Sequence, residues 1–391
     1  MKVGILFDAN IKFGGSHQMS VNNLLDIKKI LIKKNLQCIV LAHRKSKILD
    51  DLTIEYKIIK LSIFDYLYLI FQNSFVFKLL VHKIKFLSSF EKKIKKNNIK
   101  FVFFLFTSYK ALLLQDTSFA STVFDTCHKD FPEFTETKSF NIFYFREFLN
   151  KKILPISSIV ITESVELKEK IIKFYQLNTN RIISIPNLAS ELLLRSKDVA
   201  NINAVKNKYN LNNNFYFYPA QFWPHKNHLI ILRAIKKLKE QNKNIYFVFC
   251  GHDKGHLEFI VNKIKEYKII ENIKILDYLP ETELVALYLL SDALVMPTYF
   301  GPTNIPPLEA WHLKIPVVYS SYLRNHGDSA ALYFNPNSEE ELILALNKLQ
   351  DNKIRKDLIF KGEERIKSLN LQRSEGLNLL SYKLEELKKI I

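Results

Sequence analysis

The sequence predicts an α/β protein built from two doubly wound parallel sheets, and three observations support this. Short, nearly continuous apolar runs alternate with longer amphipathic runs, which is typical of parallel strands covered by helices on both faces. The alternation breaks at an asparagine-rich stretch, 187–213, and then starts again. The chain has 391 residues, 48% of them hydrophobic, which is enough for two cores.

The first series of strands predicts a domain over 1–195. Its strands are expected at 2–9, 37–42, 100–106, 121–125, 158–164 and 181–186. Amphipathic stretches at 20–35 and 165–177 predict helices that cover this sheet.

The second series predicts a domain over 205–371. Its strands are expected at 215–220, 245–251, 273–279, 293–298 and 315–320. Helices are predicted between them at 227–241 and 281–291. Three further helical patterns close the chain, at 338–350, 351–368 and 372–391.

Composition narrows the class of partner. The formal net charge is +18, which favours phosphate in nucleic acid, anionic lipid or a small ligand, although a solvated lysine-rich surface is the alternative. No nucleic-acid-reading motif is present, so nucleic acid is not expected. Three cysteines without paired spacing predict a reducing compartment and no metal site. The opening "MKVGILFDA" is typical of a strand rather than a signal peptide, and no apolar run is long enough to span a bilayer, so we expect a cytoplasmic protein.

Ligands of open parallel sheets bind beyond the carboxyl ends of the strands, so the loops there are the candidate sites. The loop after the first strand contains Gly14 and Gly15 and precedes a helix, an arrangement that favours close approach of an anion. It matches neither a dinucleotide fingerprint nor a P-loop, and a flexible turn is the alternative.

The loop at 218–228, "YPAQFWPHKNH", places Lys226 at the start of a helix. The positive end of the helix dipole disfavours a lysine there unless both share an anion. The alternative is an exposed lysine. We interpret Trp223 and His225 as packing residues.

The stretch 299–320 holds four prolines, and two of them, Pro306 and Pro307, are predicted to begin a helix. Free backbone amides are expected around Thr303, Asn304 and Ile305. Glu309, one turn further, accepts hydrogen bonds from a ligand or compensates the helix dipole.

A fourth loop, "DTCHKDFPEF" at 125–134, gathers titratable groups that include Asp125 and His128. Histidine is suited to acid–base chemistry or to contact with phosphate. An ordinary polar loop is the alternative.

Together these stretches resemble family 4 glycosyltransferases of the GT-B fold, most strongly over 215–335, where "FGPTNIPPLEA" is the most specific motif. The resemblance implies two Rossmann-like domains facing across a cleft, with 372–391 packed back on the first. It implies transfer of a sugar from a nucleotide-diphospho-sugar with retention of configuration, without a metal or other cofactor.

The resemblance also implies a role for each candidate residue. Glu309 holds the ribose and Lys226 meets the diphosphate. The remaining donor contacts fall on Gly15, Gln221, Tyr278, Leu279, Thr303, Asn304 and Ile305, with Tyr278 and Leu279 bordering the base.

Three positions depart from the family pattern. A first glutamate falls on Gly301, an arginine on Gln221 and a first-domain histidine on Phe124. The first two departures occur in the branch with "FGPTN" and "FWPHKNH". The third departure leaves the first domain without the usual histidine, and we expect His128 or Asp125 to replace it in catalysis.

The predicted function is sugar transfer in cell-surface polysaccharide synthesis, such as lipopolysaccharide O-antigen or capsule, to a saccharide or lipid-linked acceptor. The alternatives are a degenerate sugar-nucleotide-binding protein and a sugar-nucleotide epimerase. The stretch 63–100 combines aromatics with lysines, and we expect peripheral contact with an anionic membrane, chiefly through 81–98. For 63–80 an ordinary core-facing helix is the alternative.

Overall fold

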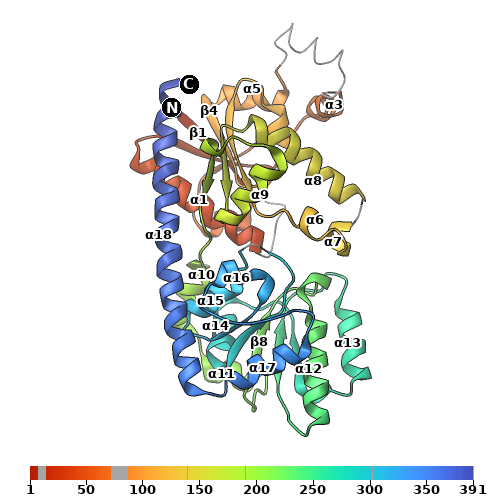
Figure 1. The fold of residues 1–391 in the computed structure, drawn as a ribbon. Helices are drawn as coiled ribbons and strands as arrows, with labels where there is room; N and C mark the ends of the chain where they lie inside the picture. Colours follow the sequence, from red (N-terminus) through yellow and green to blue (C-terminus); the bar gives the residue numbers. More distant parts are fainter. Residues whose placement is uncertain (8–14, 72–86, 139, 190, 302, 391) are drawn as a thin grey trace. The chain divides into compact units, whose positions relative to one another are not determined.

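The computed structural model describes residues 1–7, 15–71, 87–138, 140–189, 191–301 and 303–390. These residues form two compact units, each built on a parallel sheet (Figure 1). Unit 1 comprises Met1–Thr126, Phe140–Pro186 and Gln372–Ile391, and unit 2 comprises Cys127–Ser139 and Asn187–Leu371.

Unit 1 has a seven-stranded sheet in the order β3-β2-β1-β4-β5-β6-β7. Its strands are β1 (Lys2–Phe7), β2 (Gln37–Ala42), β3 (Tyr56–Ile58), β4 (Ile99–Phe104), β5 (Ser118–Val123), β6 (Ile159–Thr162) and β7 (Ile182–Ser184). Its principal helices are α1 (Gly15–Lys33), α2 (Lys47–Asp51), α3 (Ile63–Phe71), α5 (Ser89–Lys96), α8 (Phe140–Ile153) and α9 (Val165–Tyr175).

Both faces of this sheet are buried, which explains why its strands are apolar almost without interruption. Val3 and Ile5 of β1 pack with Leu24 of α1 on one face. Leu6 of the same strand packs on the other face with Phe90 and Ile94 of α5. Alternate side chains of one strand thus belong to two separate cores.

Unit 2 has a six-stranded sheet in the order β10-β9-β8-β11-β12-β13. Its strands are β8 (Tyr216–Pro219), β9 (Phe247–Cys250), β10 (Ile273–Leu276), β11 (Ala293–Met296), β12 (Val317–Ser320) and β13 (Leu332–Phe334). Its helices are α6 (Cys127–Asp130), α7 (Thr135–Lys138), α10 (Glu191–Arg195), α11 (Ile202–Lys208), α12 (His228–Glu240), α13 (Leu257–Glu266), α14 (Glu281–Leu290), α15 (Ile305–His312), α16 (Arg324–Gly327) and α17 (Glu339–Lys348). The winding direction reverses between β8 and β11, so a topological switch point lies there.

The prediction of two doubly wound parallel sheets is confirmed. Two edge strands, β3 and β13, were not expected, since each is short and only partly buried. The segment Cys127–Ser139 lies inside the 1–195 span expected for the first domain, yet it is part of unit 2. The cause is aromatic packing, because Phe131 and Phe134 contact the ring of Phe300.

The end of the chain also differs from expectation. Separate helices over 351–368 and 372–391 were predicted, but one helix, α18 (Asn352–Ile390), runs through both. The intervening residues 369–371 include neither proline nor glycine, so nothing there stops a helix. From Gln372 onward α18 belongs to unit 1, where Leu380 and Leu384 join the core.

Candidate functional site

The switch point of unit 2 brings together the loops that follow β8 and β11. The backbone carbonyl of His225 in the first loop accepts from the amide of Tyr299 at 3.0 Å and from Thr298 Oγ1 at 3.2 Å in the second. The His225 ring stacks on Phe300, with ring centroids 4.0 Å apart and an interplanar angle of 15°. The two loops therefore form a single fixed surface at the carboxyl edge of the sheet.

Lys226 contributes a cation to this surface. Its Nζ donates to Asn304 Oδ1 at 3.2 Å, so one of three N–H groups is used and two remain for an anion. Burial lowers the pKa of Lys226 to about 8, although the nearby Glu136 carboxylate acts in the opposite direction. The ammonium therefore lies at a site where an added negative charge is favourable.

Asn304 holds its amide oxygen toward Lys226 because its amide nitrogen is engaged. That nitrogen donates to the carbonyl of Gly301 at 2.9 Å and to the hydroxyl of Tyr319 at 3.0 Å. Gly301 has a φ of 119°, and a Cβ there would lie 2.7 Å from Asn304 Oδ1. A side chain would therefore be strained at this position, where the family pattern has a glutamate.

The first turn of α15 presents few backbone donors. Pro306 and Pro307 follow Ile305 and have no N–H. Among the described residues, none accepts from the amides of Asn304 and Ile305. The side chain of Thr303 accepts from Asn187 at 3.1 Å, so its hydroxyl helps to position the loop.

Glu309 lies one turn into α15 and is 4% exposed. Burial raises the pKa of its carboxyl to about 7, while a hydrogen bond from the Tyr288 hydroxyl to Oε2, at 2.8 Å, opposes this. Tyr288 belongs to α14, and no sequence signal marked it as a partner. Protonation of Glu309 therefore falls near neutral pH.

A flat aromatic surface lies near the ends of β9 and β10. The ring of Tyr278 stacks on His252, with centroids 5.0 Å apart and an angle of 11°. His252 Nδ1 is 3.2 Å from Asp277 Oδ1. Tyr278 is about half exposed, whereas the side chain of Leu279 is buried, so only the backbone of Leu279 can face a ligand.

The loop after β8 is shaped by its own side chains. Gln221 Oε1 accepts from Trp223 Nε1 at 3.1 Å. A Cβ at Gly251 would lie 2.5 Å from the carbonyl oxygen of Ala220, so this glycine lets the loops after β8 and β9 approach each other.

Glu136 is a member of this site that sequence reasoning missed. From α7, its carboxylate contacts His225 Nδ1 and accepts from the His225 amide at 3.3 Å. Burial acts to raise the pKa of Glu136, but hydrogen bonds from His225, from the backbone and from Thr135, together with the charge of His225, outweigh burial and lower this pKa. Glu136 lies just beyond the loop 125–134 in which the sequence predicts titratable groups, and only the fold identifies it as the residue that contacts His225.

The remaining predicted residues have separate surroundings. Asp125, in unit 1, forms an ion pair with Arg146 of α8. His128, in unit 2, is fully buried in α6. Gly15 is the first residue of α1, and the loop 8–14 before it lies outside the described residues.

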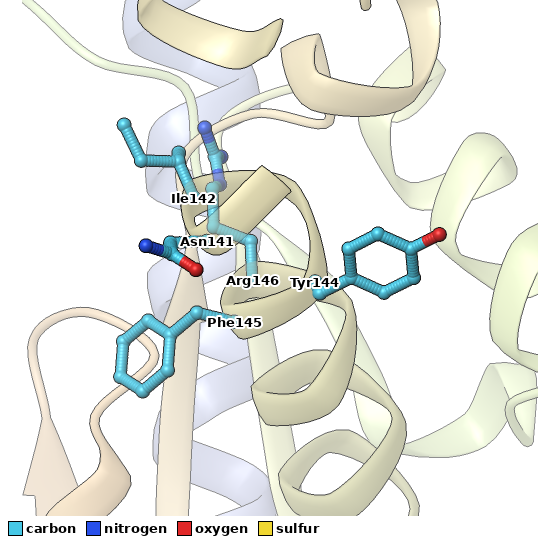
Figure 2. Close-up of a pocket in the computed structure, with 5 residues that line it drawn as sticks. All are labelled: Asn141, Ile142, Tyr144, Phe145 and Arg146. Carbon is cyan, nitrogen blue, oxygen red and sulfur yellow. The ribbon is translucent and has the colours of Figure 1, made fainter. Parts of the chain in front are cut away.

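Unit 1 carries an open pocket of about 500 Å³ on the first turns of α8 (Figure 2). Its lining is mostly apolar and consists of Asn141, Ile142, Tyr144, Phe145 and Arg146. Through Arg146 the pocket adjoins Asp125, one of the two predicted catalytic residues. Aromatic and hydrogen-bonding groups thus meet beside a carboxylate.

Comparison with known proteins matches a long segment of unit 2 to a known family. Residues 200–365 match the family model described as Glycosyl transferases group 1. The O-antigen chain mannosyltransferase RfbU of Salmonella typhimurium is 27% identical over 209 residues, which cover 53% of this chain and 55% of that protein. The O-antigen chain mannosyltransferase B of Escherichia coli is 24% identical, with 59% and 62% covered. The match thus spans less than two thirds of either relative.

Two solved structures share the fold over nearly all of their length. A glycosyltransferase from Rickettsia africae has a TM-score of 0.70 at 16% identity, with 98% of each chain covered. Anabaena Alr3699/HepE in complex with UDP-glucose has a TM-score of 0.70 at 13% identity, with both chains fully covered. The chain therefore has two Rossmann-like units of the GT-B fold, and its residues 200–365 match the model of the Glycosyl transferases group 1 family.

Proposed function

We propose that the protein is a retaining glycosyltransferase that uses a nucleotide-diphospho-sugar donor. The observation that carries the proposal is the pairing of Lys226 with Asn304 at the switch point, with the buried carboxylate of Glu309 in the helix that follows. A cation for phosphate and an acceptor for ribose hydroxyls thus belong to loops and helices at one edge of one sheet.

The chemistry follows from charge. When the bond between the sugar C1 and the phosphate oxygen breaks, negative charge grows on the departing nucleoside diphosphate. The Lys226 ammonium, with two N–H groups not given to Asn304, stabilises that charge more in the transition state than before it. The acceptor hydroxyl loses its proton as its oxygen bonds C1, and Asp125 is our candidate for receiving it, with His128 the second candidate.

Tyr278 and its stacking partner His252 are proposed to border the base, because an exposed flat ring suits a heterocycle. Gln221 and Asn304 are proposed to shape the donor loops around the diphosphate.

The acceptor is proposed to be a saccharide on a lipid carrier in O-antigen or capsule synthesis. The curated relatives are described as O-antigen mannosyltransferases, so mannose is the first sugar to test. The apolar lining of the α8 pocket suits the faces of sugar rings, and the amide of Asn141 can bond to hydroxyls.

Such an acceptor would place the protein at the inner face of a cytoplasmic membrane, in peripheral contact with anionic lipid. Among the described residues, none of the helices has the length and apolar character needed to cross a bilayer.

The test is donor turnover. The protein is incubated with GDP-mannose, UDP-glucose and related donors, and release of nucleoside diphosphate and free sugar is measured without acceptor. Turnover of one donor, lost in Lys226→Met, supports the proposal. Tight donor binding without turnover, with or without a lipid-linked saccharide, would instead identify a degenerate binding protein.

A further inference from the structure

Helix α3 has an apolar outer side. Six of its nine side chains are exposed, with exposed fractions from 41% to 69%: Ile63, Phe64, Tyr66, Leu67, Ile70 and Phe71. At 100° per residue these six span an arc of about 160° with no charged residue in it. The inner side of α3 faces the core through Tyr68, as in the alternative for 63–80, but its outer side is apolar rather than lysine-rich; residues 72–80 lie outside the described residues.

The helix cannot roll to bury this arc, because a charged residue fixes its inner side. Asp65 is fully buried. Its Oδ2 accepts from the backbone N–H of Ser62 at 2.8 Å and from Ser62 Oγ at 2.9 Å. Its Oδ1 accepts from the amide of Phe90 in α5 at 2.9 Å. If the helix rotated about its axis, the buried carboxylate and these donors would lose their hydrogen bonds. The free energy lost in this way exceeds the free energy gained by burying the apolar arc.

Lysines lie on the segments that adjoin α3. Helix α5 is bound to α3 through Asp65, and Lys93 of α5 donates to the carbonyl of Lys60 at 2.7 Å, just before α3. The exposed lysines Lys60, Lys92 and Lys96 lie on these two segments. Lys95 of the same helix forms an ion pair with Asp116.

We propose that α3 inserts its apolar arc into the interfacial region of an anionic lipid bilayer, while Lys60, Lys92 and Lys96 contact the headgroups. An arc of aliphatic and aromatic side chains next to basic residues has the composition of a helix that lies in a membrane interface. A second copy of the chain fits less well, since two copies would bring like-charged lysines together. The inserting element is thus α3, whereas α5 turns Phe90 and Ile94 into the core and contributes charge alone.

This inference rests on the proposed function only in that a lipid-linked acceptor calls for a membrane. The full-length protein is sedimented, without donor, with vesicles of phosphatidylcholine alone or with one third phosphatidylglycerol. We expect binding to the anionic vesicles that weakens at high salt but does not vanish, because apolar insertion is not screened. Failure of this experiment leaves donor turnover, measured separately, unaffected.

The variant Phe64→Gln/Ile70→Gln should lower the partition coefficient about tenfold or more. The matched control is Ile270→Gln/Phe360→Gln in unit 2, where both side chains are similarly exposed and binding should not change. Lys92→Gln/Lys96→Gln should weaken binding at low salt only. In Phe64→Trp, indole emission should shift to the blue with vesicles and be quenched by brominated lipid.

Three results would overturn the proposal. One is absence of binding to anionic vesicles at low salt. Another is binding by Phe64→Gln/Ile70→Gln equal to that of wild type, with no spectral shift in Phe64→Trp. The third is a dimer in solution that the double variant dissociates, which would show that a second copy covers α3. Unchanged circular dichroism and melting temperature of each variant establish that the fold is intact.

Discussion

The affinity for nucleoside diphosphates should depend on pH with a bell-shaped profile. Lys226 has its pKa lowered by burial to about 8, and Glu309 has its pKa raised by burial to about 7. Lys226 is charged below the first value and Glu309 is charged above the second. Both groups are largely charged only between these two pKa values, so the affinity for UDP or GDP should be highest near pH 7.5.

The magnitude follows from the ionised fractions. At pH 9 only about one tenth of Lys226 keeps its proton, and at pH 6 about one tenth of Glu309 is ionised. A hydrogen bond to a charged group contributes about 1.5–3 kcal/mol, which corresponds to about a tenfold to hundredfold change in affinity. Affinity should therefore fall by about an order of magnitude on either side of the optimum.

Comparing a nucleoside with its diphosphate separates the acid limb of the pH profile from the alkaline limb. Uridine or guanosine shares the ribose but lacks phosphate, so its affinity should show the acid limb alone. Isothermal titration calorimetry from pH 5.5 to 9.5 measures both ligands. Lys226→Met should remove the alkaline limb, and Glu309→Gln should remove the acid limb while weakening nucleoside and diphosphate alike. A flat profile, or equal losses of both ligands in Lys226→Met, would refute the assignment of these two residues.

A further measurement on Lys226→Met and three further variants test the surroundings. Lys226→Met should raise the free energy of unfolding at pH 7, measured by urea denaturation, by about 1–2 kcal/mol. The pKa of Lys226 is lower in the folded chain than in the unfolded chain, so the charged ammonium destabilises the folded state at every pH below the lowered pKa, and the variant removes this cost. Glu136→Gln should move the alkaline limb to lower pH, since its carboxylate supports the charge of Lys226; an unmoved limb would contradict this. Gly301→Glu should weaken UDP binding and lower the free energy of unfolding by about 1–3 kcal/mol, because position 301 has a positive φ and a side chain there would contact Asn304. Gly376→Ala should cost about 1–3 kcal/mol, because a Cβ would lie 2.3 Å from the carbonyl oxygen of Ser184, whereas exposed Ser374→Ala should be nearly neutral.

The sequence was sufficient to predict the features that depend on local pattern. Continuous apolar strands are visible because both sheet faces are buried, and the loops after β8 and β11 are marked by prolines and by Lys226. The strands β3 and β13 were missed because they are short and only partly buried, whereas the equally short β7 was predicted because its isoleucines are buried. The contacts of Glu309 with Tyr288 and of His225 with Glu136 join residues 21 and 89 positions apart, and only the fold brings them together.

The electrostatics of the site indicate how a ligand would stabilise it. The charges of Lys226 and Glu309 are each hydrogen-bonded to a neutral partner, the amide of Asn304 and the hydroxyl of Tyr288. Neither partner offsets the loss of hydration, so burial favours the neutral form of each group. The pKa of Lys226 is therefore lowered and that of Glu309 is raised. A donor supplies what the free site lacks, since its diphosphate brings countercharge to the ammonium and its ribose brings hydroxyl donors to the carboxylate. Binding should therefore raise the pKa of Lys226 and lower that of Glu309, which broadens the pH range over which the bound protein holds both charges. Proton uptake measured at pH 8.5 during UDP binding, and proton release at pH 6.5 during uridine binding, would follow from these two shifts. If neither proton exchange occurred in buffers of different ionisation enthalpy, the ligand would not contact these two groups.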